Sequence, residues 1–301
     1  MGTADLIPGV SGGTIAFLSG IYEELLESVR VVSGSALKLL LRGQINAAAR
    51  TVPWAFLVPL ALGMATAIFS LAGVLSWLLE THPAFVWAFF FGLVLASTHI
   101  VMKRVNRWDF TDIAGFVIAA IATYILVGMR PTETPTHLPF IFVSGVIAIC
   151  AMILPGISGS YILVLLGKYH YILSAVVHRD LLTLTIFTSG CVVGLSLFAR
   201  VLSWLFARYH DIAIAVLAGI MLGSMRVIWP WKDTITTNTD AHKMVSSLAG
   251  QNILPDTLDM SVVLAILLGG AGMALVYALD RLHVVKERTE DIPETKSATT
   301  A

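Results

Sequence analysis

Two short stretches decide the fold: Pro8-Gly9-Val10-Ser11-Gly12-Gly13 near the start of the chain, and Pro155-Gly156-Ile157-Ser158-Gly159-Ser160 in its middle. Each interrupts a long apolar region, the first at residues 6–26 and the second at residues 138–177. At membrane depth, an interrupted helix is tolerated only where protein or a wet cavity surrounds the exposed backbone. We therefore interpret both stretches as broken or re-entrant segments of a helical membrane protein.

The composition agrees with this interpretation. Of the 301 residues, 57% are hydrophobic and 13% are charged, whereas soluble domains carry roughly 25% charged residues. There are 19 Lys and Arg residues against 19 Asp and Glu, so the chain lacks the net basic charge of a nucleic-acid binder. The fold class that these numbers favour is an all-α polytopic membrane protein.

Six further apolar runs have about the 20 residues that a helix needs to cross a bilayer. They are residues 53–79, 84–102, 110–129, 181–206, 212–229 and 261–282. Cytoplasmic loops of membrane proteins collect Lys and Arg. Placing the basic loop 103–109 inside puts most Lys and Arg residues on that side, and it predicts that both termini are cytoplasmic.

The chain also repeats itself. The first broken segment recurs 147 positions later, with Ser11 matching Ser158 and Tyr22 matching Tyr169. Residues 74–78 recur as residues 201–205, at an offset of 127. The difference between the offsets indicates a 20-residue insertion in the first copy. We place this insertion in the basic stretch near residues 30–50 and expect an amphipathic helix at the membrane interface.

Each copy therefore holds one broken or re-entrant helical segment followed by three transmembrane helices. Because three crossings is an odd number, the second copy must be inverted relative to the first, which is a transporter architecture with its binding site near the midplane. We predict a first inverted repeat at 1–137, a second at 138–284, and a polar cytoplasmic tail at 285–301. The alternative is a duplicated bundle in which the Pro-Gly sites are only kinks.

The broken segments are candidate anion sites. After each break an apolar helix begins, its first N–H groups have no partner within the helix, and its dipole presents positive charge. Such a terminus suits phosphate or carboxylate. The candidate phosphate-binding residues are Ser11, Gly12, Gly13, Thr14, Ser158, Gly159 and Ser160. For each hydroxyl, the alternative role is helix capping alone.

Three cations lie within or beside apolar segments: Lys168, Arg200 and Arg226. A cation at membrane depth costs about 2.5–3.5 kcal/mol on insertion scales, so it is a functional candidate by default. We expect these side chains to balance the charge of a bound phosphate. The alternative is that each extends to the lipid headgroups, which is easiest for Arg226 at the end of its span.

Three acids are candidates for carrying a coupling proton: Asp5, Glu23 and Glu24. The alternative for the two glutamates is an interfacial pair close to Arg30. The histidines and the two cysteines show no metal-ligand spacing, and we predict neither a metal nor a cofactor.

Residues 4–14 and 148–160 resemble the paired signature of a bacterial polyprenyl-phosphate transporter family, domain-of-unknown-function family 368. The resemblance extends to about Leu282. It implies return of undecaprenyl phosphate to the cytoplasmic leaflet of the bacterial inner membrane, for envelope biogenesis. Polyprenyl-phosphate lipid and membrane lipids are the implied partners. Members of this family usually carry a further apolar stretch before the first signature. Here seven residues precede Pro8, so either the chain starts further upstream or its first arm is short.

Two other functions stay open. Membrane undecaprenyl-diphosphate phosphatases resemble this chain in their broken segments, but their Pro-Gly-x-Ser-Arg-Ser signature has Arg where this chain has Gly12 and Gly159. A phosphatase needs cationic stabilisation of the phosphoryl group and an activated nucleophile, so we expect a transporter and not an enzyme. The third possibility is a transporter of a small inorganic anion.

Overall fold

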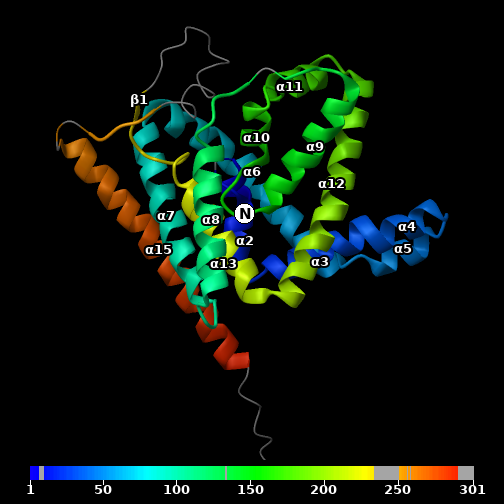
Figure 1. The fold of residues 1–301 in the computed structure, drawn as a ribbon, viewed down its shortest axis with the longest axis horizontal. Helices are drawn as coiled ribbons and strands as arrows, with labels where there is room; N and C mark the ends of the chain where they lie inside the picture. The colour runs from blue at the N-terminus through cyan, green and yellow to red at the C-terminus, as the bar shows by residue number, and fades with distance from the viewer. Residues whose placement is uncertain (7–9, 133, 234–250, 256, 258, 291–301) are drawn as a thin grey trace, which may run out of the picture.

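The computed structural model describes residues 1–6, 10–132, 134–233, 251–255, 257 and 259–290. These residues form a helical bundle (Figure 1) with one two-residue antiparallel ladder, in which β1 (Lys232–Asp233) pairs with β2 (Gln251–Asn252). The all-α prediction is confirmed apart from this ladder. The ladder joins two parts of the loop that precedes the last helix.

Within the part of the chain that the structure describes, four helices are long and apolar enough to cross a membrane. They are α6 (Trp54–Thr81), α7 (Pro83–Lys103), α12 (Leu181–Arg208) and α15 (Met260–Glu290). Two predicted spans are shorter as helices, namely α8 (Phe110–Leu126) and α13 (His210–Ser224). The ends of these two helices meet, because the guanidinium of Arg226 packs directly onto Gly128. Turns at this contact end both helices before the apolar sequence ends.

The predicted breaks are present, and each segment carries a second break that the sequence did not predict. In the second segment, α9 (Leu138–Ile153) ends before the Pro-Gly motif and α10 (Gly159–Leu165) follows it. The chain then bends by 107° into α11 (Tyr169–Val177) at Gly167, which has a φ of 62°. A positive φ is accessible to glycine without steric cost.

The first segment has the same order of elements. α1 (Gly2–Asp5) precedes the motif, and α2 (Gly12–Leu18) and α3 (Tyr22–Arg30) follow it. Its second break is at Gly20, with a φ of 72°. Gly20 and Gly167 are 147 positions apart and matched in the sequence, so the repeat carried a signal for this turn.

The inserted stretch is a helical hairpin and not the single amphipathic helix that we predicted. α3 continues into a π-helix, η1 (Val31–Ala36), and then into α4 (Leu37–Leu41). The chain reverses at Gly43, with a φ of 74°, and returns as α5 (Ile45–Thr51). In the second half, only residues 178–180 separate α11 from α12. The hairpin therefore accounts for the 20 extra residues of the first copy.

Three pairs of matched helices have equal lengths, and the matched helices α7 and α13 have matched neighbours. α2 and α10 have seven residues each, α3 and α11 have nine, and α6 and α12 have 28. α7 packs on α15, and its counterpart α13 packs on α8. The backbones approach closely at Gly92 and Gly219, which are 127 positions apart: Gly92 lies against Gly269, and Gly219 against Phe116. Small residues at such crossings are typical of membrane helices. The duplication is thus visible in the packing, while the opposite orientation of the copies stays a prediction.

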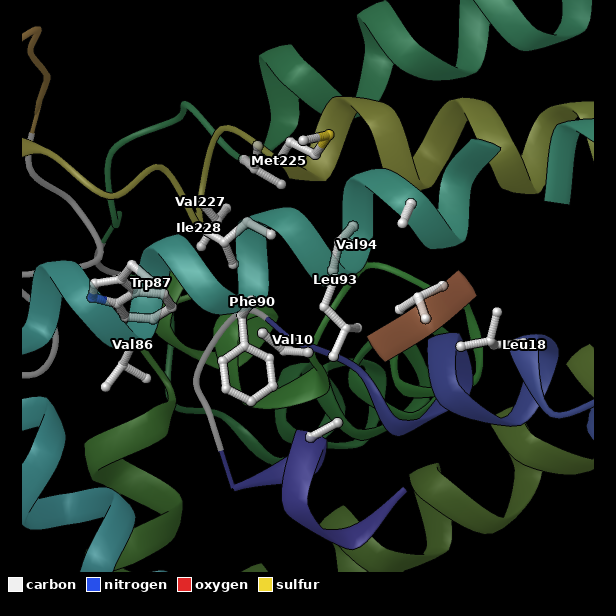
Figure 2. Packing of buried hydrophobic residues seen from close by; sticks show 14 of the residues in the cluster. Val10, Leu18, Val86, Trp87, Phe90, Leu93, Val94, Met225, Val227 and Ile228 are labelled. Atoms are coloured by element: carbon white, nitrogen blue, oxygen red, sulfur yellow. The ribbon is translucent and has the colours of Figure 1, made fainter. Parts of the chain in front are cut away.

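One large cluster of buried hydrophobic residues is built around α7, which is the most buried of the four long helices. Figure 2 shows Phe90, Leu93 and Val94 of α7 beside Val10 of the first broken segment. Residues after α13, such as Ile228, pack on the same cluster. Val10 of the first motif is therefore anchored at the centre of the bundle, while Pro8 and Gly9 of the same motif lie outside the described residues.

The last helix extends into the region that we predicted as a polar tail. α15 continues through residue 285 to Glu290, so the first six residues of the predicted tail are helical. The remainder of that tail, 291–301, lies outside the described residues. The proposed division at 137/138 falls in the irregular segment between α8 and α9.

Candidate functional site

The described residues of the first motif meet the segment that leads into the second motif, in the middle of the bundle. The hydroxyl of Ser11, in the first motif, lies 3.3 Å from the carbonyl oxygen of Leu154, which leads into the second. Tyr22 of α3 donates a hydrogen bond to the carbonyl of Ile153 at 3.1 Å. A Cβ atom on Gly13 would stand 2.9 Å from the same Ile153 oxygen, so only glycine allows this approach. The candidate residues of both copies therefore belong to one region.

The two motifs cap their helices differently. Ser11 and Ser158 have similar extended backbone angles, with φ and ψ of −117° and 132° against −96° and 133°. The Ser11 hydroxyl accepts from the N–H of Gly13 at 3.1 Å, which is an N-cap. The Ser158 hydroxyl instead pairs with the Ser160 hydroxyl at 2.8 Å and makes no cap bond. The backbone angles are shared, but the hydroxyls of the second motif are left for other partners.

A carboxylate of the chain itself lies on the first motif. The N–H of Gly12 donates to Asp5 Oδ1 at 2.6 Å. Asp5 therefore lies at the beginning of α2, in the place where we predicted an external anion. The matching position in the second copy is Met152, which cannot play this part. Of the three acids that we considered for proton coupling, Asp5 is the one that contacts a motif.

The two motifs also differ in how deeply their residues are buried. Ser11, Gly12, Gly13 and Thr14 are all buried. The Thr14 side chain is fully buried, and its hydroxyl has no hydrogen-bond partner among the described residues. In the second motif Gly159 is buried, whereas Ser158 is half-buried and Ser160 is exposed. In this conformation the second motif presents its hydroxyls and the first does not.

Lys168 lies at the other end of α10. Its side chain is 1% exposed, its ammonium donates to the carbonyl of Thr134, and it stands 5.6 Å from the ring centre of Phe140. Seven helical residues span about 10 Å, so Lys168 is separated from Ser158 by the length of this helix. The structure gives Lys168 a place in the packing of the segment that precedes α9.

Arg226 packs on the end of α8. Its guanidinium donates to the carbonyl of Tyr124 at 3.2 Å and lies 4.5 Å from the centre of the Tyr124 ring. Tyr161, the third residue of α10, donates to the carbonyl of Val127 in the same turn. Tyr161 stands at the position that matches Thr14. The sequence repeat contained that pairing, but it gave no sign that Tyr161 ties α10 to α8.

Arg200 is not placed with the motifs. It is an exposed residue of α12, and its Nη2 atom lies 3.4 Å from the position of a Cβ on Gly34 of η1. One turn earlier, the Ser196 hydroxyl donates to the carbonyl of Ser33 at 3.2 Å. Arg200 lies within a long helix, as the sequence predicted, but its neighbour is the π-helix, which the sequence did not predict.

Glu23 and Glu24 line a pocket of about 390 Å³ between α3 and α12. Both are exposed. Glu23 lies 3.6 Å from His210, whereas Arg30 pairs with Glu27 at 3.1 Å. Among the described residues, the acid that pairs with Arg30 is therefore Glu27, and not one of the two candidates. These glutamates do not form one cluster with Asp5.

The comparisons with known proteins point to one family. Residues 1–246 match the model of the VCA0040-like family, described as undecaprenyl phosphate translocase-like. A polyprenyl-phosphate transporter of Vibrio cholerae is 42% identical over 288 residues, which are 93% of each chain. A polyprenyl-phosphate transporter of Staphylococcus aureus is 30% identical over 76% of this chain and 83% of its own. No solved structure matches. The chain belongs to the undecaprenyl phosphate translocase-like family.

Proposed function

We propose that this family member translocates polyprenyl phosphate, such as undecaprenyl phosphate, across the bacterial cytoplasmic membrane. The two relatives that bear the name polyprenyl-phosphate transporter support this function. The structural observation that carries it is the contact between Ser11 and Leu154, which brings the two small-residue motifs together. A phosphate held there is surrounded by protein, while the prenyl tail stays in lipid.

The second motif is the place where we expect the phosphate to bind first. Ser158 and Ser160 present adjacent hydroxyls, and the N–H groups that begin α10 lack a side-chain cap. Hydroxyl and backbone N–H donors together suit phosphate oxygens. In the first motif the Asp5 carboxylate takes the corresponding N–H. A phosphate can enter the first motif only after Asp5 has moved or has been protonated.

The replacement of the Asp5 carboxylate by a phosphate can be coupled to a proton. Protonation of Asp5 removes the negative charge that would repel a phosphate from the first motif. Glu23 and Glu24 are less suited, because they lie on the exposed side of α3. We propose that a proton on Asp5 accompanies the headgroup, and that inverted repeats let the site face each leaflet in turn.

Arg226 is the cation that we assign to charge balance, since it packs on the same α8 end as Tyr161 of α10. Arg200 would meet a headgroup at another stage, along the side of α12 that faces η1. Lys168 would act indirectly, by holding the segment before α9 against α10 and α11. Each role is testable by replacing the cation with an uncharged residue. If the charge is needed, the variant should transport polyprenyl phosphate more slowly.

The experiment that tests the function is the exposure of polyprenyl phosphate at the outer leaflet of living cells, read with an externally added phosphate-lipid-binding probe. Depletion of the protein is expected to raise outer exposure, and the wild-type chain to restore it. The double variant Ser158→Ala/Ser160→Ala is expected to fold but not to restore it. Unchanged exposure on depletion, in cells without a second translocase, would contradict the proposal.

Two further assays separate the other functions. Release of phosphate from undecaprenyl diphosphate by the purified protein would identify a phosphatase instead. Competition by free inorganic phosphate, with none by a short-chain polyprenyl phosphate, would identify a small-anion transporter. We expect neither result, because Gly12 and Gly159 replace the arginines that the phosphatase signature carries.

A further inference from the structure

The helical hairpin formed by η1, α4 and α5 (residues 31–51) has no counterpart in the second half, and the function proposed above does not use it. Figure 1 shows α4 and α5 projecting from the body beyond α3 and α12, on the side opposite α15. Its first part, η1, lies against Ser196 and Arg200 of α12, and its last part, α5, leads into α6. A structure that one half carries and the other lacks makes the two membrane surfaces different for this protein.

The hairpin carries charge of one sign. Residues 28–79 contain no Asp or Glu, and the hairpin itself holds Lys38, Arg42 and Arg50. All three are exposed. The neighbouring Arg30 is excluded from this set because it pairs with Glu27. The hairpin therefore presents uncompensated positive charge to whatever surrounds it.

The tip of the hairpin is also apolar. Leu40, Leu41 and Ile45 flank the turn at Gly43, and their side chains are 49%, 80% and 67% exposed. Apolar residues that project from a turn among basic residues are typical of segments that lie in the interface between headgroups and acyl chains. In water, these three apolar side chains would stay exposed without any apolar surface to pack against.

The position of the hairpin relative to a span fixes its depth. α6 begins at Trp54, three residues after α5 ends, and the indole N–H of Trp54 donates to the carbonyl of Ala49 at 2.7 Å. The Trp54 side chain is 53% exposed. Tryptophan at the end of a span sits at headgroup level. The hydrogen bond therefore holds α5 at the height of the headgroups.

From these observations we infer that the hairpin is a surface-binding arm for anionic lipid headgroups, with its leucine tip inserted and its basic side chains on the phosphates. Its partner is the leaflet at the α5 end of α6. A second copy of this chain is a poorer partner for the same face, because it would bring identical positive charge against it. In the second half, the three-residue turn at 178–180 gives no such surface.

The test is an environment-sensitive fluorophore on Leu41→Cys, in full-length protein that also carries Cys150→Ala and Cys191→Ala. The labelled protein is reconstituted in phosphatidylcholine vesicles with increasing fractions of phosphatidylglycerol. The matched control is Val177→Cys, an equally apolar residue that is 70% exposed at the corresponding turn. A second version of the Leu41 protein carries Lys38→Gln, Arg42→Gln and Arg50→Gln.

We expect the Leu41 label to shift to the blue as phosphatidylglycerol increases, and the Val177 label to stay unchanged. Each basic side chain that is removed should lower the affinity of the tip for the anionic surface about fivefold, since a basic residue near such a surface contributes about 1 kcal/mol. An identical Leu41 spectrum at all lipid compositions would overturn the inference. So would a shift that follows the protein-to-lipid ratio, which would assign the tip to a second copy. Because the readout is independent of transport, it can fail while the proposed function stands.

Discussion

The two halves of this molecule have corresponding helices, but they differ in the side chains and insertions that these helices carry. Ser11 and Ser158 begin equivalent helices with similar backbone angles, yet Ser11 is buried and caps its helix, whereas Ser158 is half-buried and makes no cap bond. The first half adds a carboxylate, Asp5, and a basic hairpin. The second half adds a bulky arm, α9, that packs along α12. The duplication thus gives both halves the same helices, and single residues or insertions make the two halves different.

The largest expected effect concerns helix packing at the matched glycines Gly63 and Gly190. A Cβ on Gly190 would meet the backbone of Phe142 in α9, whereas nothing lies within 4 Å of a Cβ on Gly63. We expect Gly190→Leu to cost about 3 kcal/mol or more through overpacking, and Gly63→Leu to be nearly neutral. Thermal unfolding of both variants in detergent measures the difference. Equal losses would mean that the two halves pack alike after all.

The second prediction compares the serines. Ser158→Ala/Ser160→Ala is expected to lower transport of polyprenyl phosphate in proteoliposomes by tenfold or more, with little change in thermal stability, because neither hydroxyl caps its helix. Ser11→Ala should instead destabilise the fold by about 1 kcal/mol, since its cap is lost. If Ser11→Ala abolished transport at full stability while the double variant transported normally, the roles of the motifs would be reversed.

The third prediction concerns the connections between the last two helices of each half. Residues 104–109 form a short loop, whereas the longer connection after α13 carries Lys232, whose ammonium lies 5.4 Å from the centre of the Trp87 ring. Burial lowers the pKa of Lys232 from 10.5 to about 8. Between these two pH values the unfolded chain binds more protons than the folded one, so stability rises with pH across that window.

Lys232→Met should remove this rise, which we expect to amount to about 1 kcal/mol after allowance for solvent screening. Melting temperatures of both proteins from pH 7 to pH 10 provide the measurement. The difference between them should shrink steadily above pH 8, as the wild-type amine loses its proton. Parallel curves would show that Lys232 keeps its ordinary pKa.

The smallest expected effect concerns Asp5 and its counterpart Met152. Asp5→Asn should leave the contact with Gly12 in place while removing the charge, and transport should lose its dependence on pH with a change in rate of only a few-fold. Glu23→Gln/Glu24→Gln should keep the pH dependence. A wild-type rate that does not vary with pH would dismiss proton coupling altogether.

The helical class, the breaks at both Pro-Gly motifs and the offset of the insertion were predictable from local pattern. They depend on the length of apolar runs and on residue types that act within a few positions, and the duplication displayed each of them twice. Even the missed bends at Gly20 and Gly167 were present as a matched pair of glycines.

Which residues meet was decided only by the tertiary structure. The sequence treated Lys168, Arg200 and Arg226 as equivalent cations, and the fold sends them to three different neighbours: Thr134, Gly34 and Tyr124. The fold also brings the Asp5 carboxylate to the backbone N–H of Gly12. These outcomes depend on how helices distant in the chain cross and where they bend. Local composition determines that a helix forms and breaks, but the partner of a side chain follows from the packing of the whole bundle.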